Sequence, residues 1–102
     1  MKEITLVATV PELKIRLFGE IDVRNRDRFL REVTAFYTAS PANILLDCTD
    51  VTFIDSRGIG ALVSVLNQIS ANGHTLTLCS LNANIKRTLI HCNLADRFIF
   101  TD

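Results

Sequence analysis

Residues 50–60 read Asp50-Val51-Thr52-Phe53-Ile54-Asp55-Ser56-Arg57-Gly58-Ile59-Gly60, and they join two segments whose apolar residues are spaced differently. The segment before them, Ile44-Leu45-Leu46, is purely apolar and is followed by Asp47, as expected for a buried strand. The segment after them has apolar residues spaced i, i+3, i+4 and i+7, which is typical of an amphipathic helix. These residues are Ile59, Leu62, Val63, Leu66 and Ile69. The pattern therefore predicts a strand, a loop and a helix in succession.

The predicted loop contains the candidate functional residues. Asp55 or Ser56 can cap the helix by accepting a hydrogen bond from an otherwise unpaired amide of the first turn. Gly58 and Gly60 lack side chains, so a neighbouring strand or another molecule can approach the backbone there. A serine hydroxyl at the positive end of a helix is also a suitable place for an anion, in particular a phosphate. Because such caps are common, the spacing alone favours a plain cap.

Composition limits the possible classes of protein. With 102 residues, of which 48% are hydrophobic, residues 1–102 are expected to form one small domain with its own core. Lys and Arg total 11, as do Asp and Glu, so the net basic charge that is typical of nucleic-acid binding is absent. The sequence contains no run of about 18 apolar residues, the length that a membrane-spanning helix needs. The start of the chain resembles a strand rather than a signal peptide.

The cysteines indicate a reducing compartment. Cys48, Cys79 and Cys92 are odd in number, widely spaced and without a C-x-x-C pair, which favours neither a disulfide framework nor a zinc site. Each lies in or beside an apolar segment, so we expect all three to be buried as small hydrophobic residues. The expected location is the cytoplasm.

The rest of the chain alternates strand and helix patterns. The predicted strands are Ile4–Ala8, Leu13–Phe18, Ile44–Leu46, Thr75–Cys79 and Phe98–Phe100, and the predicted helices are Val23–Tyr37, Arg57–Asn72 and Ala83–His91. A turn at Pro11–Glu12 should make the first two strands an antiparallel hairpin. The order β-β-α-β-α-β-α-β predicts an α/β fold with a mixed, mostly parallel sheet covered by helices. Functional loops of such folds lie at the carboxyl ends of the strands.

The ends of these elements are predicted from local signals. Gly19-Glu20-Ile21-Asp22 should stop the second strand, with Asp22 as the cap of the first helix. That helix should bury one stripe, formed by Phe29, Leu30, Val33, Phe36 and Tyr37. Its other side carries Arg24, Arg28 and Arg31, and a solvated face with an Asp27–Arg31 pair is the favoured interpretation. Asn82 should cap the third helix, which buries Ile85 and Leu89.

The sharpest enzymatic alternative is a serine esterase with Ser56 as its nucleophile. Its G-x-S-x-G elbow needs a small residue two positions before the serine, where this chain has Ile54 before Ser56. The two histidines, His74 and His91, both come at the carboxyl end of a predicted helix. The helix over residues 57–72 would be about 24 Å long and would separate Ser56 from His74. A general base must lie within about 3 Å of the proton it removes, so this pair does not form a catalytic couple.

No cofactor or metal is predicted either. A phosphate-binding P-loop needs G-x-x-x-x-G-K-[ST], and the Gly58-x-Gly60 pattern lacks both the lysine and the spacing. Neither an H-E-x-x-H motif nor a cluster of His and Cys is present in the sequence. We therefore predict a protein without catalytic activity.

With all elements placed, the sequence resembles the STAS domain, in particular the anti-sigma-factor antagonists of bacteria. The resemblance covers the order of elements along the whole chain. It is most specific at Gly19-Glu20-Ile21-Asp22 and at Val51-Thr52-Phe53-Ile54-Asp55-Ser56-Arg57-Gly58-Ile59-Gly60-Ala61-Leu62. In that family, the serine after the aspartate of this loop is phosphorylated by a partner kinase.

The resemblance implies a switch. The unmodified antagonist binds an anti-sigma serine kinase and so frees a sigma factor, and phosphorylation abolishes the binding. Carried over, Ser56 is the phosphoacceptor, a serine phosphatase would act on phospho-Ser56, and Asp22 should lie near it at the same end of the sheet. The partner-binding residues implied are Asp22, Asp55, Ser56, Arg57, Gly58 and Ile59.

One residue departs from the family pattern. Position 57, usually Ser or Thr, is Arg57 here, and an arginine could pair with a phosphate or with an acidic partner. Two other functions remain open. The domain could be a scaffold in a signalling assembly, or a docking subunit of a lipid-transport complex that works without a phosphorylated serine.

Overall fold

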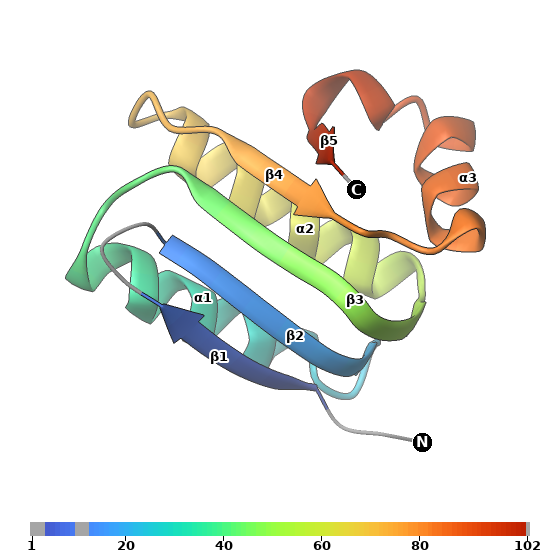
Figure 1. Ribbon diagram of the computed structural model, residues 1–102, viewed down its shortest axis with the longest axis horizontal. Helices are drawn as coiled ribbons and strands as arrows, with labels where there is room; N and C mark the ends of the chain where they lie inside the picture. The colour runs from blue at the N-terminus through green and yellow to red at the C-terminus, as the bar shows by residue number, and fades with distance from the viewer. Residues whose placement is uncertain (1–3, 10–12, 102) are drawn as a thin grey trace.

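A computed structural model describes residues 4–9 and 13–101 and has the predicted order of elements (Figure 1). The strands are β1 (Thr5–Thr9), β2 (Leu13–Ile21), β3 (Ile44–Ile54), β4 (Leu76–Cys79) and β5 (Ile99–Thr101). The helices are α1 (Arg26–Ala39), α2 (Ser56–Ser70) and α3 (Ala83–His91), with a short 3-10 helix, η1 (Ala95–Arg97). The turn predicted at Pro11–Glu12 lies outside the described residues.

The five strands form one mixed sheet in the order β1-β2-β3-β4-β5. β1 pairs with β2 in antiparallel fashion, and the other neighbours are parallel, so the predicted hairpin and mostly parallel sheet are confirmed. β3, which begins with the apolar run at residues 44–46, is the central strand as predicted. The carboxyl ends of β2, β3 and β4 meet at one edge, on the right in Figure 1. We call this edge the carboxyl edge.

The core lies between the sheet and two helices. α1 and α2 lie side by side behind the sheet in Figure 1, and α3 lies beyond the carboxyl edge. Leu46 of β3, Leu62 of α2 and Leu78 of β4 are completely buried. In β2, buried Ile15 and Leu17 flank the exposed Arg16, so one face of the strand packs on the helices while the other meets solvent. The sheet is therefore covered by helices on one face.

The apolar stripes predicted for α1 and α2 are the faces that these helices turn toward the core. In α2, Ile59, Leu62, Leu66 and Ile69 are buried and Val63 is partly buried. Ala61 and Val65 are buried as well, which widens the stripe. In α1, Phe29, Val33 and Tyr37 are buried, while Leu30 and Phe36 pack partly exposed against the core. α3 has the predicted bounds, and the Asn82 side chain accepts a hydrogen bond from the Ile85 amide.

The predicted ends of the second and third strands are wrong. β2 continues through Gly19 to Ile21, and β3 continues to Ile54, because residues 19–21 pair with residues 51–54 in the parallel ladder. The register shifts between Gly19 and Glu20, and Gly19 has a φ of 110°, a conformation that favours glycine. The glycine therefore marks an irregularity within the strand and does not end it.

Asp22 is not the cap of the first helix. Its carboxylate is bonded to Arg24 and to no amide of the helix, and α1 begins at Arg26, after Asn25. The Asp22 backbone carbonyl instead accepts the Arg26 amide at 2.9 Å. The predicted Asp27–Arg31 pair is wrong. Asp27 instead pairs with Arg26, with 3.0 Å between Asp27 Oδ1 and Arg26 Nη1.

The prediction that all three cysteines are buried is also wrong. Cys48 is buried and Cys79 half-buried, but Cys92 is exposed. Cys92 follows the last residue of α3, so the helix no longer directs it along the buried stripe of Ile85 and Leu89.

Candidate functional site

The β2–α1 and β3–α2 loops are joined at the carboxyl edge by Asp55. Its amide donates to the Ile21 carbonyl at 3.1 Å, and its Oδ2 accepts the Val23 amide at 3.2 Å. Its Oδ1 accepts the Gly58 amide at 2.9 Å, so Asp55 is the N-cap of α2. One carboxylate thus fixes the start of α2 against the preceding loop. The two segments that carry the family resemblance therefore lie in contact.

Gly58 allows this close approach. A Cβ at residue 58 would lie 2.5 Å from the Ile21 carbonyl oxygen and 2.6 Å from Cγ2 of Ile54, too close for any side chain. The expectation that a neighbouring strand approaches the backbone here is confirmed. Gly60 differs, because a Cβ there would meet no atom within 4 Å. Packing therefore requires glycine at position 58 but not at position 60.

Asp22 is the first residue of the β2–α1 loop, and its side chain is buried and paired with Arg24. Arg24 donates to both of its carboxylate oxygens, through the Arg24 amide at 2.9 Å and Nη2 at 2.8 Å. These bonds from Arg24 hold the pKa of Asp22 below its ordinary value of 3.8, although burial acts in the opposite direction. Asp22 is thus an ionised group whose charge is already compensated by its neighbour.

Asn25 supports this arrangement and was not singled out from the sequence. Its Oδ1 accepts the Asp22 amide at 3.0 Å, and its Nδ2 donates to the Glu20 carbonyl at 2.8 Å. Asn25 is 8% exposed, so both bonds are shielded from water. An asparagine just before a helical pattern was the available signal, but it indicates only a cap.

The other predicted site residues differ in their exposure. Ser56, the first residue of α2, and Arg57 are both exposed. Gly58 and Ile59 are buried and belong to the packed side of the first turn of α2. Arg57 forms no ion pair with any residue in the part of the chain that the structure describes. Of the predicted site residues, Ser56 and Arg57 are therefore the ones whose side chains are exposed to another molecule.

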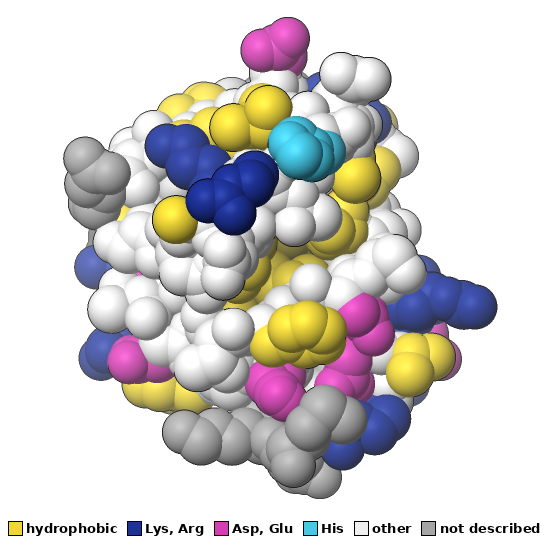
Figure 2. Space-filling view, turned by 90° about the vertical axis from the view of Figure 1, so that its right-hand side faces the viewer, with side chains coloured by type: hydrophobic (Ala, Val, Ile, Leu, Met, Phe, Trp, Pro, Cys, Tyr) yellow, Lys and Arg dark blue, Asp and Glu magenta, His cyan; other side chains and the backbone are white. Residues whose placement is uncertain are grey.

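Figure 2 views the molecule from the carboxyl edge. Acidic side chains gather in its lower half around a hydrophobic side chain, and lysine, arginine and histidine side chains lie above them. A hollow with hydrophobic side chains at its floor separates the two groups. Acidic side chains thus form a group on this face, with basic side chains both above it and beside it, in a protein whose net charge is zero.

Other features do not suggest a catalytic or metal site. His74 contacts Tyr37, with Nδ1 2.5 Å from the tyrosine oxygen, and it follows the far end of α2 from Ser56. With 15 residues, α2 is about 22 Å long, so His74 is out of reach of the serine. Within residues 4–9 and 13–101, no group of His, Cys, Asp or Glu is arranged to hold a metal ion. None of the described helices combines the length and apolarity that a membrane span needs.

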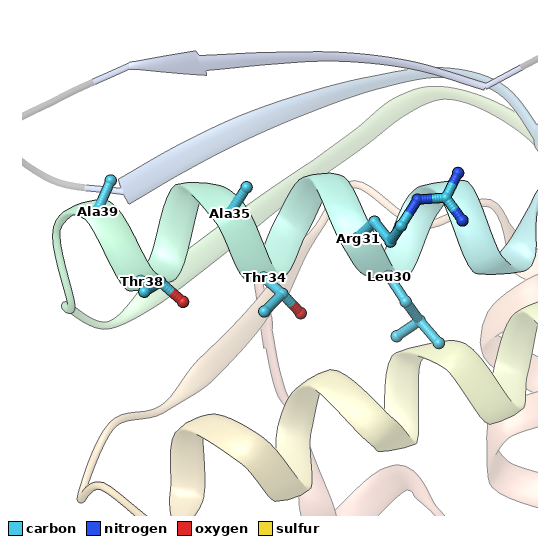
Figure 3. Close-up of a pocket in the computed structure, with 6 residues that line it drawn as sticks. All are labelled: Leu30, Arg31, Thr34, Ala35, Thr38 and Ala39. Atoms are coloured by element: carbon cyan, nitrogen blue, oxygen red, sulfur yellow. The ribbon is translucent and has the colours of Figure 1, made fainter.

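A shallow hollow on α1 lies away from this loop (Figure 3). Leu30 points toward α2, and the arginine and alanine side chains turn elsewhere. Its lining residues are Leu30, Arg31, Thr34, Ala35, Thr38 and Ala39, all from one helix. No residues from separate elements converge on it, as they do at the carboxyl edge.

Comparisons with known proteins agree with this geometry. The family model described as STAS domain matches residues 3–102. A Thermotoga maritima protein named "Putative anti-sigma factor antagonist" is 33% identical over 81 residues, which are 78% of this chain and 71% of that protein. A crystal structure of a T. maritima protein with the same description covers 97% of this chain and 86% of its own, with 25% identity and a TM-score of 0.83.

More distant structures share the fold. The Bacillus cell fate determinant SpoIIAA in the phosphorylated form is 20% identical, with a TM-score of 0.73 over 98% of this chain and 92% of its own. A sulfate transporter family protein from Wolinella succinogenes is 20% identical, with a TM-score of 0.72 over 92% and 80% of the two chains. From the match over residues 3–102 and the Thermotoga relative, the chain belongs to the STAS domain family, and its relatives include proteins named as anti-sigma factor antagonists.

Proposed function

We propose that this protein is an anti-sigma-factor antagonist that works as a phosphorylation switch at Ser56. Without the modification it binds an anti-sigma serine kinase and thereby frees a sigma factor. The kinase phosphorylates Ser56, which ends the binding, and a serine phosphatase restores it. The observation that carries the proposal is an exposed serine at the start of α2, on a loop that Asp55 and Gly58 hold in place.

The loop geometry fits a hydroxyl that is modified by another protein. Ser56 projects from the first position of a helix, and the bonds of Asp55 to both loops define where that position lies. An exposed hydroxyl on a fixed backbone can enter the active site of a kinase without local unfolding. The Thermotoga relative and the phosphorylated form of SpoIIAA support the same interpretation.

Phosphorylation should leave the fold intact. A phosphate adds about −1.5 to −2 charges at pH 7. At a helix N-terminus a negative charge is favourable by about 0.3–1 kcal/mol. The carboxylates of Asp22 and Asp55 in the two joined loops are already engaged, Asp22 by Arg24 and Asp55 by the amides of Val23 and Gly58. The modified residue therefore fits the free protein.

The switch must act at the interface. A partner surface that covers Ser56 in its unmodified form would have to desolvate a dianion after modification, close to Asp22 and Asp55. Like charges placed together in an interface can cost several kcal/mol, and about 4 kcal/mol is a thousandfold in affinity. The proposal therefore needs no large conformational change.

The six implied partner-binding residues take different parts in this proposal. Ser56 and Arg57 make direct contact, because both side chains are exposed. Asp55 and Gly58 set the position of the loop through the 2.9 Å cap and the close packing on Ile21. Asp22 and Ile59 support it from the buried side.

Arg57 is proposed to contact the partner or the phosphate, and not to stabilise the fold. Its side chain is exposed and makes no ion pair within the described residues. Arg57→Ser, which introduces the residue usual in the family, should leave the melting temperature nearly unchanged and alter partner affinity. A large loss of stability with unchanged binding would make Arg57 a structural residue.

The test of the proposal compares three proteins with a purified anti-sigma serine kinase from the source organism. Ser56→Ala should fold, bind and resist phosphorylation, whereas Ser56→Asp should fold and lose most of the affinity. Circular dichroism verifies that each variant is folded. Equal binding by the wild type and Ser56→Asp would instead favour the second candidate, a STAS scaffold or docking subunit of a signalling assembly or lipid-transport complex, without a phosphorylation switch. The fold shared with the sulfate transporter family protein favours keeping that candidate.

A further inference from the structure

The two edge strands of the sheet differ in how they are protected. β5 is three residues long, and a very short edge strand is one of the ways in which natural sheets limit pairing with another chain. β1 is five residues long and pairs with β2 along its whole inner side. No described strand or helix lies beyond β1 at the lower edge of the sheet in Figure 1. The outer backbone groups of β1 are therefore open to another strand.

The sequence of β1 lacks the residues that usually block such pairing. Thr5-Leu6-Val7-Ala8-Thr9 contains no charged residue and no proline. Thr5, Val7 and Thr9 are β-branched, as is favoured in strands. Exposed edge strands of native proteins commonly carry lysine, proline or a bulge, whereas the register of β1 with β2 is regular. β1 is thus a regular and uncharged edge.

The middle of β1 presents an apolar side chain on the face of the sheet that the helices leave uncovered. Val7 is 49% exposed and lies opposite Arg16 of β2, which is exposed on the same face. Arg16 is engaged on its other side by Asp47 and Asp50 of β3, at 3.7 and 3.4 Å. The charge beside Val7 is therefore directed toward the centre of the sheet and away from its edge.

A second copy of the same strand fits this edge. Two β1 strands can pair in antiparallel fashion about a two-fold axis, because such an interface uses the same surface of both subunits. With the axis at the middle of the strand, Val7 lies beside Val7 of the partner subunit, and Thr5 lies beside Thr9 of the partner subunit. Threonine pairs across strands are favourable, and the two valines shield each other from water. A strand of a different protein would find no charge on β1 to select it, whereas a second copy matches each position.

We propose that two copies of this protein pair through β1 and join their two five-stranded sheets into one continuous sheet. The two-fold axis reverses the strand direction in the second copy, so the carboxyl edges of the two subunits point in opposite directions. The Ser56 loop lies at the carboxyl edge and not along the outer side of β1, so it stays exposed in both subunits. The dimer is thus independent of the proposed switch and presents two Ser56 loops.

Sedimentation equilibrium of the purified 102-residue protein tests whether the dimer forms. The mass should rise with concentration from one subunit to two and no further, because the two-fold pairing uses the open edge of both copies. A protein that stays a single subunit up to about 1 mM would overturn the proposal, as would growth beyond two copies.

Charged variants of Val7 test where the subunits pair. Val7→Lys and Val7→Glu each place like charges beside one another at the axis, so each variant alone should dimerise about tenfold more weakly or worse. Mixed in equal amounts, the two variants should form a heterodimer, because the charges across the axis are then opposite. Ile99→Lys is the matched control, since Ile99 is 48% exposed on the other edge strand, and it should dimerise like the wild type.

The outcomes of these experiments are distinct from those at Ser56. Val7 is not part of the core, so circular dichroism should show that its variants are folded. Variants that dimerise like the wild type, or a mixture that stays monomeric, would overturn the pairing through β1. If a variant does not fold, the concentration dependence of the wild type still decides whether the dimer exists. Ser56→Asp should dimerise normally, so the switch and the dimer stand or fall separately.

Discussion

Replacing Gly58 by alanine should destabilise the protein, whereas the same change at Gly60 should not. A Cβ at position 58 would lie 2.5 Å from the Ile21 carbonyl oxygen and 2.6 Å from Cγ2 of Ile54. The first contact is with backbone, so the start of α2 and the end of β2 must move apart. Overpacking of this kind costs about 1–3 kcal/mol. The Ile21 carbonyl also accepts the Asp55 amide at 3.1 Å, and weakening this bond adds to the cost.

The same substitution has a favourable component, which the second variant isolates. Alanine is a better helix former than glycine by about 1 kcal/mol. At Gly60 a Cβ meets no atom within 4 Å, so only this gain should appear. At position 58 the weakened Asp55–Ile21 bond, worth about 1 kcal/mol, offsets this gain, so we expect Gly58→Ala to lose about 1–3 kcal/mol in total and Gly60→Ala to gain up to about 1 kcal/mol.

Urea unfolding followed by circular dichroism measures both free energies. The midpoints should move in opposite directions from that of the wild type, with similar slopes. Two midpoints that both rise, or a Gly58→Ala protein as stable as the wild type, would refute the close packing of the two loops. Because the strain acts on the Asp55 contacts, Gly58→Ala should also weaken kinase binding more than Gly60→Ala does.

Three further outcomes are expected. Leu62→Ala should cost about 2–5 kcal/mol in urea unfolding, since Leu62 is completely buried, and a loss below about 0.5 kcal/mol would mean that α2 is misplaced. Cys92 should react rapidly with a thiol reagent, whereas Cys48, whose pKa burial raises to about 12, should react only after unfolding; rapid labelling of Cys48 would contradict its burial. Asp22, whose pKa is lowered mainly by its bonds to Arg24, should stabilise the fold above its ordinary pKa of 3.8 and lose that contribution as the pH falls further. Asp22→Asn should therefore reduce the loss of stability on acidification below about pH 4, and an unchanged pH profile would contradict the pairing.

Much of the fold could be predicted because its signals are local. The apolar spacing of α2, the run at residues 44–46 and the cap at Asn82 each depend on neighbours in the sequence. The ends of β2 and β3 could not be predicted in this way. Gly19 resembles a stop, and only the pairing of residues 19–21 with residues 51–54 shows that the strand continues through it.

The residues of the candidate site were also only partly predictable from the sequence. Asp55, Ser56 and Gly58 could be selected from the sequence, because a cap and a glycine at a helix start have a recognised spacing. The bonds of Asn25 to Asp22 and to the Glu20 carbonyl depend on the path of the β2–α1 loop. The position of Glu20 opposite Phe53 in the paired strands follows only from tertiary packing. Sequence patterns therefore located the loop but not what surrounds it.

The most direct test of the switch is calorimetric titration of the anti-sigma serine kinase with unmodified protein and with authentic phospho-Ser56 protein. Circular dichroism should give the same spectrum for both forms, because the phosphate at the start of α2 does not disturb the fold. We expect the unmodified form to bind and the phosphorylated form to bind about a thousandfold more weakly. Equal affinities of two folded forms would contradict the switch and leave a constitutive docking module.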